Sequence, residues 1–432
     1  MDAHVRAEWD RLRTVALHRP GMEMFFGLLE PYASLYDRAF SQDGALSEIR
    51  QLEEILHRDF GVGVVHLRET ITARADGDPA FRDRLVEAGR DSIAFSGDPE
   101  EARLAQREFE KTTALHDAGF FFDLMLLHPV VGLSAGPGIR EIDSSVTGRQ
   151  PLSNLYFLRD QQAVTANGVV LGSMAKPQRR REPAVTRLFW EATGTPVTGE
   201  VEGSGTFEGG DFFPLGDFAL VGTGDRTDRA GAARFLASGP GYDEIGIVRQ
   251  PAHPLAGGGG YDPMVAMHLD TWFNVASSGV AVGLEPLMRE ARVEVMAKDG
   301  DGYRKEGEET DLFSYIRSKG FDVIGITTLE QMAFAPNFLC IRDGTILAVE
   351  VDRTAREVLK TLGEKAAMMP SRYGALLAQA RKDYEKLRRE GQFFPHKKEI
   401  YSHDIDAVPV SLVNLTGGYG AAHCLTCPIR RG

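Results

Sequence analysis

Pairs of apolar strands recur along the chain. Each copy is an apolar segment, a short turn containing Gly, Asp or Asn, and a second apolar segment, and four copies begin at residues 154, 209, 270 and 337. Stretches such as DRAGAARFLAS and TAREVLKTLGEK, whose apolar spacing is typical of helices, lie between the copies, and a short apolar strand follows them. A looser fifth copy, LRTVALHRP with QLEEILHRDFGVGVVHL, stands near the N-terminus. The pattern predicts five units of the order strand, strand, helix, strand.

The strand pair in each unit limits how the units can be assembled. A hairpin makes its two strands antiparallel, so the repeat excludes a simple parallel sheet. Five such units arranged radially would each bury an apolar face against a neighbour. The spacing therefore favours an α/β fold, a five-bladed α/β propeller of ββαβ units that forms one domain over residues 1–432. An ordinary α+β domain with several hairpins is the alternative.

Residues 71–146 interrupt this rhythm. DGDPAFRDRLVEAGRDS and DPEEARLAQREFEKTTALHDAGFFFDLML have Asp at the position of a helix N-cap and apolar residues at helical spacing. We therefore predict a helical insertion after the first unit and not a further blade.

The composition argues against several classes of partner. Of 432 residues, 43% are hydrophobic and 26% are charged, and the net charge is -13 with a pI near 5.4. Nucleic acids and anionic membranes need a basic surface, so we expect neither as a partner and leave a homo-oligomer open. The sequence has no run of 18 apolar residues, no apolar core of a signal peptide and only three cysteines. These features predict a cytoplasmic protein.

Thiol, imidazole and carboxylate groups occur at equivalent places in different units. NLTGGYGAAHCLTC leads through glycines to Cys424, and small neighbours leave a thiol accessible. GTFEGGDFFPL places Glu208 at a Gly-Gly kink, and MHLDTWFN would put His268 and Asp270 on the same face if the segment is a strand. Asp160 lies between apolar strand residues. Taken singly, each has a structural explanation, such as a buried thiol or a polar turn; together they favour a shared site.

Cys424 and Cys427 also form a C-x-x-C pair, a spacing that occurs in thioredoxin-like redox sites and in zinc sites. A thioredoxin-like site places the pair where a strand enters a helix, whereas Pro428 follows here. A zinc site needs a second pair of ligands at suitable spacing, and none is evident in the sequence. We therefore expect no metal and no other cofactor.

Six ordered motifs resemble those of arginine deiminases. NLYFLRD, QRRREP, FEGGD, LVGTGDRTDRAG, MHLDTWF and HCLTCP occur in the order and at the approximate spacing of that family, as does the N-terminal LRTVALHRPG. The resemblance covers most of the chain and is specific for the guanidino-group-modifying superfamily. It implies the pentein fold, a five-bladed α/β propeller with the active site at its axis, in agreement with the repeat.

The same resemblance implies roles for the candidate residues. Cys424 would be the nucleophile, His268 the general acid and base, and Glu208 the group that assists the histidine and the substrate. Asp160 and Asp270 would each bind guanidinium nitrogens. A guanidinium carbon is a poor electrophile and requires a thiolate, and a free Cys titrates at about 8.5. The expected reaction is hydrolysis through a Cys thiouronium intermediate, which converts L-arginine and water to L-citrulline and ammonia.

The sequence differs from the family pattern at the residues expected to bind the α-carboxylate end of the substrate. In the family an asparagine and several arginines hold the α-carboxylate, and Asn154, Arg180 and Arg226 fall at three of these places. Phe157, within NLYFLRD, is a further expected substrate contact. A fourth arginine usually lies five residues before the cysteine, where this chain has Tyr419.

The sequence does not decide two features of this α-carboxylate site. The choice among Arg179, Arg180 and Arg181 is uncertain by one residue, and the family's acidic N-terminal loop has its nearest counterpart in residues 34–37, SLYD. The alternatives to an arginine deiminase are an amidinotransferase, a hydrolase of another guanidino compound, and a binding protein that has lost catalysis.

Overall fold

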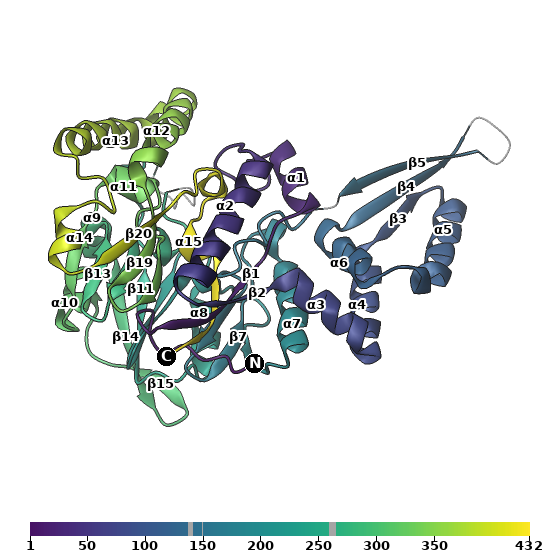
Figure 1. Cartoon of the computed structure of the whole chain (residues 1–432), viewed down its shortest axis with the longest axis horizontal. Helices are drawn as coiled ribbons and strands as arrows, with labels where there is room; N and C mark the ends of the chain where they lie inside the picture. Colours follow the sequence, from purple (N-terminus) through teal and green to yellow (C-terminus); the bar gives the residue numbers. More distant parts are fainter. Residues whose placement is uncertain (137–140, 149, 259–264) are drawn as a thin grey trace.

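The computed structural model describes residues 1–136, 141–148, 150–258 and 265–432. Five groups of three strands in it share one topology (Figure 1). In each group the central strand pairs antiparallel with the first strand and parallel with the third. Written as first, central and third strand, the groups are β6 (Gln162–Thr165), β7 (Gly168–Leu171) and β8 (Val197–Glu200); β9 (Phe212–Leu215), β10 (Phe218–Thr223) and β11 (Glu244–Arg249); β12 (Phe273–Ser277), β13 (Val280–Gly283) and β17 (Asp322–Gly325); β18 (Leu339–Arg342), β19 (Thr345–Val349) and β20 (Asp406–Val410); and β21 (Cys427–Arg431), β1 (Leu12–Leu17) and β2 (Gly63–His66).

Helices connect the central strand of each group to its parallel partner. α7 (Glu182–Thr193) begins with Pro183 in its first turn and ends at Gly194, whose φ of 71° is the left-handed conformation that glycine adopts without strain. α8 (Arg229–Ala237) begins where the Asp228 carboxylate accepts a hydrogen bond from the Gly231 N–H. The strand, strand, helix, strand order expected from the sequence is therefore present in the structure.

The fifth group combines the two ends of the sequence. β21 is the last strand and pairs with β1, near the other end, and Figure 1 shows both ends at the same side of the molecule. α1 (Met22–Leu29), α2 (Gln42–Glu54) and the short η1 (Ile55–Asp59) lie between β1 and β2. The sequence pattern contained β1 and β2 as its loosest copy, and β21 supplies the strand that this copy lacked.

Two groups carry long additions. β14 (Arg292–Asp299), β15 (Gly302–Lys305) and β16 (Thr310–Asp311) extend the β9–β11 sheet to six strands, flanked by α9 (Glu285–Glu290) and α10 (Leu312–Ser318). Between β19 and β20, α12 (Val351–Met368) and α13 (Pro370–Glu390) form a helical pair at one end of the molecule, in contact with α11 (Thr328–Met332) and followed by α14 (Lys398–Ser402) (Figure 1).

The segment predicted as a helical insertion contains a sheet as well as helices. α4 (Pro79–Ser92) and α5 (Pro99–Thr112) begin at the expected caps Asp78 and Asp98, and α3 (Leu67–Gly77) and α6 (Ala118–Leu127) accompany them. β3 (Ala94–Gly97), β4 (Pro129–Ala135) and β5 (Ile142–Gly148) form a separate three-stranded sheet that projects from the rest (Figure 1). β5 is exposed over nearly its whole length, so no alternation of apolar and polar residues marked it.

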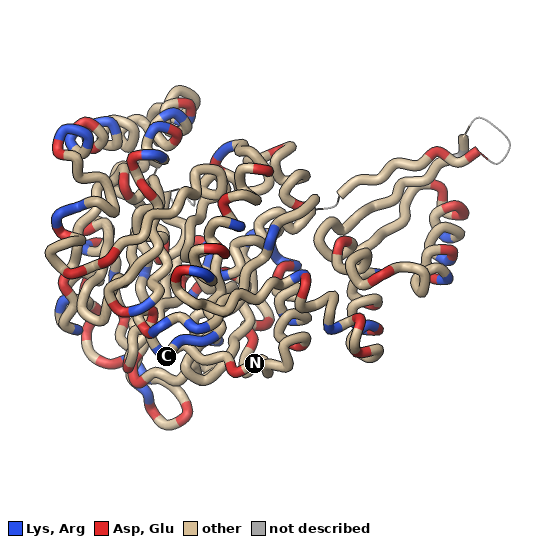
Figure 2. The backbone as a smooth tube through the Cα atoms, viewed as in Figure 1, with Lys and Arg blue, Asp and Glu red and all other residues tan. Residues whose placement is uncertain are grey.

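Charges of both signs are distributed over the whole backbone in Figure 2, including the projecting segment and the α12–α13 pair. Among the residues that the structure describes, no helix is both long enough and apolar enough to cross a lipid bilayer.

Candidate active site

The candidate side chains lie immediately before the first strand of each hairpin. Asp160 precedes β6, Glu208 precedes β9, Asp270 precedes β12 and Cys424 precedes β21. Short helical turns present three of them: η4 (Gly209–Asp211), η5 (Leu269–Thr271) and α15 (Ala422–Leu425). All four side chains and that of His268 are buried, with Asp160 the most exposed at 2%. Equivalent positions of different units therefore contribute one buried polar group.

Hydrogen bonds join these segments in a circuit. The Arg159 N–H donates to the Cys424 carbonyl (3.1 Å), and the Gly209 N–H donates to the Asp160 carbonyl (2.8 Å). The Leu269 N–H donates to the Asp211 carboxylate (2.9 Å). Two further links, the Asn337 amide to the Asp270 carbonyl (3.1 Å) and the His423 N–H to the Asn337 carbonyl (3.1 Å), lead back to the cysteine segment. Each link joins two neighbouring units, so the site and the arrangement of the units depend on one another.

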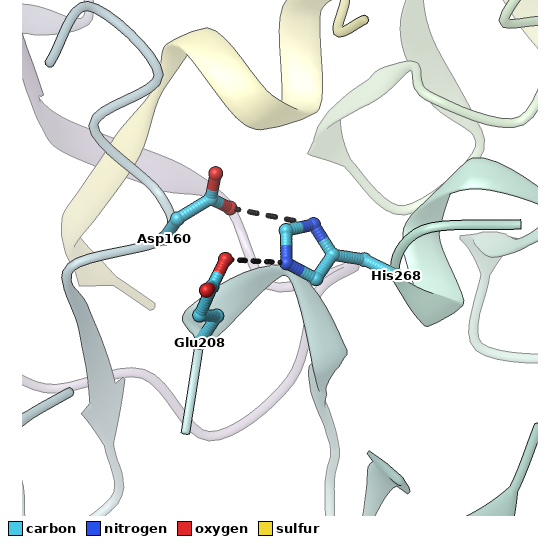
Figure 3. A group of neighbouring side chains, drawn as sticks. All are labelled: Asp160, Glu208 and His268. Carbon is cyan, nitrogen blue, oxygen red and sulfur yellow. Dashed lines mark hydrogen bonds and ion pairs between the residues drawn. The ribbon is translucent and has the colours of Figure 1, made fainter. Parts of the chain in front are cut away.

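His268 lies between two carboxylates (Figure 3). Its Nε2 is 2.9 Å from Glu208 Oε2, and its Nδ1 is 3.8 Å from Asp160 Oδ1. Burial alone would lower the pKa of His268, but Asp160, the hydrogen bond to Glu208 and the charge of Asp211 raise that pKa to about 9. His268 is therefore an imidazolium at neutral pH and can donate a proton.

Glu208 keeps its negative charge although it is fully buried. Burial alone would raise the pKa of Glu208, but Arg226, whose guanidinium lies 3.5 Å away, and the hydrogen bond to His268 lower that pKa to about 2. Its other oxygen accepts the Ala175 N–H at 3.0 Å. Glu208 is thus a fixed anion that orients the imidazolium.

The Cys424 thiol is held by Asp270 and Asn337. Sγ lies 3.2 Å from Asp270 Oδ2 and 3.1 Å from Asn337 Nδ2. The Asn337 amide oxygen accepts the backbone N–H groups of Ala421 (2.8 Å) and Cys424 (3.2 Å), which holds the start of α15 in place. Burial raises the pKa of Cys424 well above its usual value, and Asp270 and Asp160 raise it further. The free thiol is therefore protonated until a cation enters beside it.

Asp270 also contacts a buried ion-pair network behind the cysteine. Its Oδ2 is 2.8 Å from His423 Nδ1, and the His423 ring stacks on Phe213 with centroids 5.3 Å apart. His423 Nε2 is 3.5 Å from Glu8, which pairs with Arg159 (2.9 Å). Burial alone would raise the pKa of Asp270, but the hydrogen bond and charge of His423 lower it, so Asp270 remains an anion.

Asp160 and Asp270 each have one buried carboxylate oxygen that accepts no hydrogen bond from the described residues. In both residues this oxygen is Oδ1. A buried carboxylate oxygen left unpaired is costly, and it suits a ligand that brings several N–H donors. These two oxygens are therefore the available acceptors for a planar guanidinium.

A metal ion fits this group poorly. Asp160, Glu208 and His268 offer ligand atoms within 4.8 Å of one another. However, Arg179 already contacts Asp160 at 2.7 Å, Arg226 lies beside Glu208, and His268 Nε2 is engaged with Glu208. The carboxylate charges are thus already balanced by protein cations, and the histidine is protonated, which disfavours a divalent ion.

The sequence left open which arginine of the motif QRRREP contacts the substrate, and the structure separates Arg179 from Arg180. Arg179 is buried and pairs with Asp160 (2.7 Å) and Glu182 (2.9 Å), whereas the expected contact residue Arg180 is exposed. Arg226 is buried as expected and lies against Glu208 and Asp225. Arg179 thus holds the carboxylate of the candidate residue Asp160, a contact that the motif QRRREP did not predict.

The other expected substrate contacts, Asn154, Phe157 and Tyr419, are buried. Phe157 is buried, and its ring packs against the backbone of Gly418 and Gly420 in the cysteine loop. Asn154 donates from its amide to the Ser34 carbonyl at 2.7 Å and so ties the N-terminal loop to the site. Tyr419 is 5% exposed and has a backbone φ of 73°.

Asn337 is a functional residue that the sequence interpretation missed. It contacts the thiol directly and the backbone on both sides of it. A signal for it was present, because Asn337 is the first residue of its repeat copy, as Asp270 is of the preceding copy. The repeat includes this position, but an amide side chain does not indicate catalysis as a thiol or a carboxylate does.

Comparisons with known proteins agree with this geometry. The family model for arginine deiminase matches residues 33–431. The arginine deiminase of Halobacterium salinarum is 28% identical over 508 aligned positions, which cover 98% of this chain and 96% of that protein. The arginine deiminase of Rhodococcus erythropolis is 27% identical, covering 84% of this chain and 93% of that protein.

Among solved structures, the N-terminal domain of ArgZ, an arginine dihydrolase from cyanobacteria, superposes with a TM-score of 0.51 at 14% identity and covers 98% of both chains. This likeness shows a common mixed α/β fold. With a family model that spans nearly the whole chain and relatives that match it end to end, the chain belongs to the arginine deiminase family.

Proposed function

We propose that this protein is a deiminase that hydrolyses L-arginine to L-citrulline and ammonia. The observation that carries the proposal is that Asp160 and Asp270, beside the Cys424 thiol, each have a buried oxygen that accepts no hydrogen bond from the described residues. These two oxygens match the N–H groups of a guanidinium, and the thiol is the nucleophile that its carbon requires. The relatives named as arginine deiminases support L-arginine as the substrate.

The first half-reaction forms a covalent intermediate. The bound guanidinium brings a positive charge next to Cys424, which lowers the pKa of the thiol and releases its proton. The Cys424 sulfur then attacks the guanidinium carbon. As the carbon–nitrogen bond breaks, the His268 imidazolium gives its proton to the leaving nitrogen, so ammonia departs and a positively charged thiouronium remains on Cys424.

The second half-reaction is hydrolysis. His268, now neutral, takes a proton from a water molecule that attacks the thiouronium carbon. The carbon–sulfur bond breaks, which returns the thiolate and leaves the ureido group of L-citrulline. The second proton of the water leaves the new hydroxyl group as the ureido carbonyl forms and is taken up by the ammonia already released, which becomes ammonium. The thiolate takes back a proton from the solvent after product release.

We further propose that the five units are arranged radially as a five-bladed propeller with this site at the axis. The circuit of hydrogen bonds that joins the five units supports this arrangement, as does their shared topology. A cytoplasmic location is also proposed. Its support is the three cysteines, which are free and buried in the structure.

Product analysis tests the proposed reaction. Purified protein and L-arginine should yield L-citrulline and ammonia in equal amounts, and acid quenching during turnover should trap an adduct on the peptide that contains Cys424. The assay is repeated with glycine as an amine acceptor. Formation of ornithine and guanidinoacetate without ammonia would identify an amidinotransferase instead. Turnover of agmatine but not of L-arginine would show that the substrate is wrong.

A further inference from the structure

A buried lysine lies in a cavity next to the catalytic residues. Lys365 is on α12 and is only 7% exposed. Its Nζ is 2.5 Å from Asp37 Oδ1 and 2.7 Å from the Tyr419 hydroxyl, and that hydroxyl donates to Asp37 Oδ1 at 2.7 Å. Three polar groups from distant parts of the sequence thus meet at one point.

Packing alone does not explain a lysine at this position. The face of α12 that carries it also buries Val358, Thr361 and Leu362 at helical spacing. Burying an ammonium is costly unless a partner compensates it, and an apolar side chain of the same length would fill the space without that cost. The charge at Lys365 therefore calls for a role beyond packing.

The cavity is lined by this cluster and by sequence neighbours of His268 and Asp270. Asp37, Lys365 and Tyr419 line it together with Met267 and Thr271. Met267 directly precedes His268, and Thr271 directly follows Asp270. On the other side, Tyr419 adjoins Gly420, whose backbone packs against Cys424 and Phe157. A substrate with its guanidinium at Cys424 can therefore extend its tail toward Lys365.

The environment of Lys365 differs from that of the structural cation Arg179. Arg179 is surrounded by three carboxylates, those of Asp160, Glu182 and Glu208. Lys365 pairs with one carboxylate and one hydroxyl, and it faces a cavity. Asp37 and Lys365 together present one negative and one positive charge to that cavity, as the ammonium and carboxylate of a free amino acid would require.

We propose that Lys365 and Tyr419 bind the α-carboxylate of the substrate and that Asp37 binds its α-ammonium. The inference rests on the proposed function and adds to it the residues that recognise the amino-acid end. Without substrate, Asp37 pairs with Lys365 and, through its other oxygen, with Arg38 at 3.3 Å. With substrate, Lys365 and Asp37 each gain an opposite charge from the zwitterion. The helical pair α12–α13 thereby determines specificity for a free amino acid.

Two substrates that differ in one group test this assignment. L-Argininamide keeps the guanidinium and the α-ammonium of L-arginine but replaces the carboxylate by a neutral amide. Lys365→Met should raise KM for L-arginine at least about tenfold, the value of one lost charge-assisted contact, and should change kcat much less. Turnover of L-argininamide should change less than about threefold. Lys365→Arg should restore most of the lost affinity.

Control variants separate recognition from folding. Lys360→Met removes an exposed lysine from the same helix and should leave both substrates unaffected. Tyr419→Phe keeps the ring and should raise KM for L-arginine by a smaller factor than Lys365→Met, which provides an independent measurement if Lys365→Met folds poorly.

The outcomes are distinguishable. Equal losses with L-arginine and L-argininamide would give Lys365 a structural role only, and an unchanged KM for L-arginine would also overturn the assignment. A wild-type protein that converts no L-arginine would instead refute the proposed function, and this inference with it.

Discussion

The catalytic group and the Lys365 cavity are neighbours, yet they are built in different ways. Asp160, Glu208, Asp270 and Cys424 occupy the same place in repeated units and are joined by hydrogen bonds between those units. Asp37, Lys365 and Tyr419 come from a loop after α1, an added helical pair and the cysteine loop, none of which repeats. The repeat therefore positions the proposed catalytic residues, and the additions supply the residues that we propose to bind the rest of the substrate.

This contrast predicts two classes of variant. Changes in the catalytic group should lower kcat for every guanidino substrate, because they act on the reacting atoms. Changes at Lys365 and Tyr419 should act through KM and only on substrates with a carboxylate. Variants of the catalytic group test the first class, from the largest expected effect to the smallest.

Cys424→Ser should have the largest effect. A neutral hydroxyl lacks the reactivity of a thiolate, so L-arginine and L-argininamide turnover should both fall below about 1% of wild type. Cys427→Ser, which changes a cysteine in β21, should retain most activity. For both variants, citrulline release measures the activity and thermal melting measures the stability. Residual activity of more than a few per cent in Cys424→Ser would rule out the covalent mechanism.

Asp160→Asn and Asp270→Asn should come next. Each keeps the size of the side chain but removes a charge that faces the guanidinium, so kcat/KM should fall by at least about a hundredfold, or roughly 2.7 kcal/mol. The loss should be equal for L-arginine and L-argininamide, unlike that of Lys365→Met. Asp217→Asn, in an exposed ion pair with Arg6, serves as the control. Full activity in both variants would place the guanidinium elsewhere.

Asn337→Ala should lower kcat by about tenfold or more. The amide donates to the Cys424 sulfur and thereby lowers the pKa of the thiol against the opposing effect of burial. Its loss should raise that pKa, so alkylation of Cys424 by iodoacetamide should become slower at a given pH. An alkylation profile that matches wild type would show that Asn337 acts only on the backbone of α15.

The smallest expected effect is the pH dependence set by His268. Its pKa is raised from 6.5 to about 9, so the imidazolium is present at pH 7 and is lost as the pH rises through about 9. The stability that it contributes is full below pH 6.5 and disappears over the same rise. Single-turnover rates should thus be level between about pH 7 and 8 and fall about tenfold per unit above 9. A rate that stays constant to pH 10 would contradict the role of His268 as proton donor.

Much of the fold follows from local patterns. The hairpins and the helices between them have apolar spacing and turn residues that act within a few positions, and the caps Asp78 and Asp98 mark helix starts directly. The sheet β3–β5 lacked such a signal because β5 buries almost nothing. The pairing of β21 with β1 joins opposite ends of the sequence, which no local pattern reveals.

The candidate site likewise has residues that the sequence predicts and contacts that depend on the packing of distant segments. The sequence alone predicts the thiol, the histidine and three carboxylates as site residues, because each stands before a hairpin and within a motif that resembles the family, and the structure brings these side chains together. Only the tertiary structure decided that Arg179 and not Arg180 enters the site, that Asn337 holds the thiol, and that Lys365 meets Asp37 and Tyr419. A lysine on an amphipathic helix is ordinarily solvated, and a one-residue shift reverses which arginine points inward. Such contacts depend on the packing of distant segments, and that packing exists only once the units have assembled.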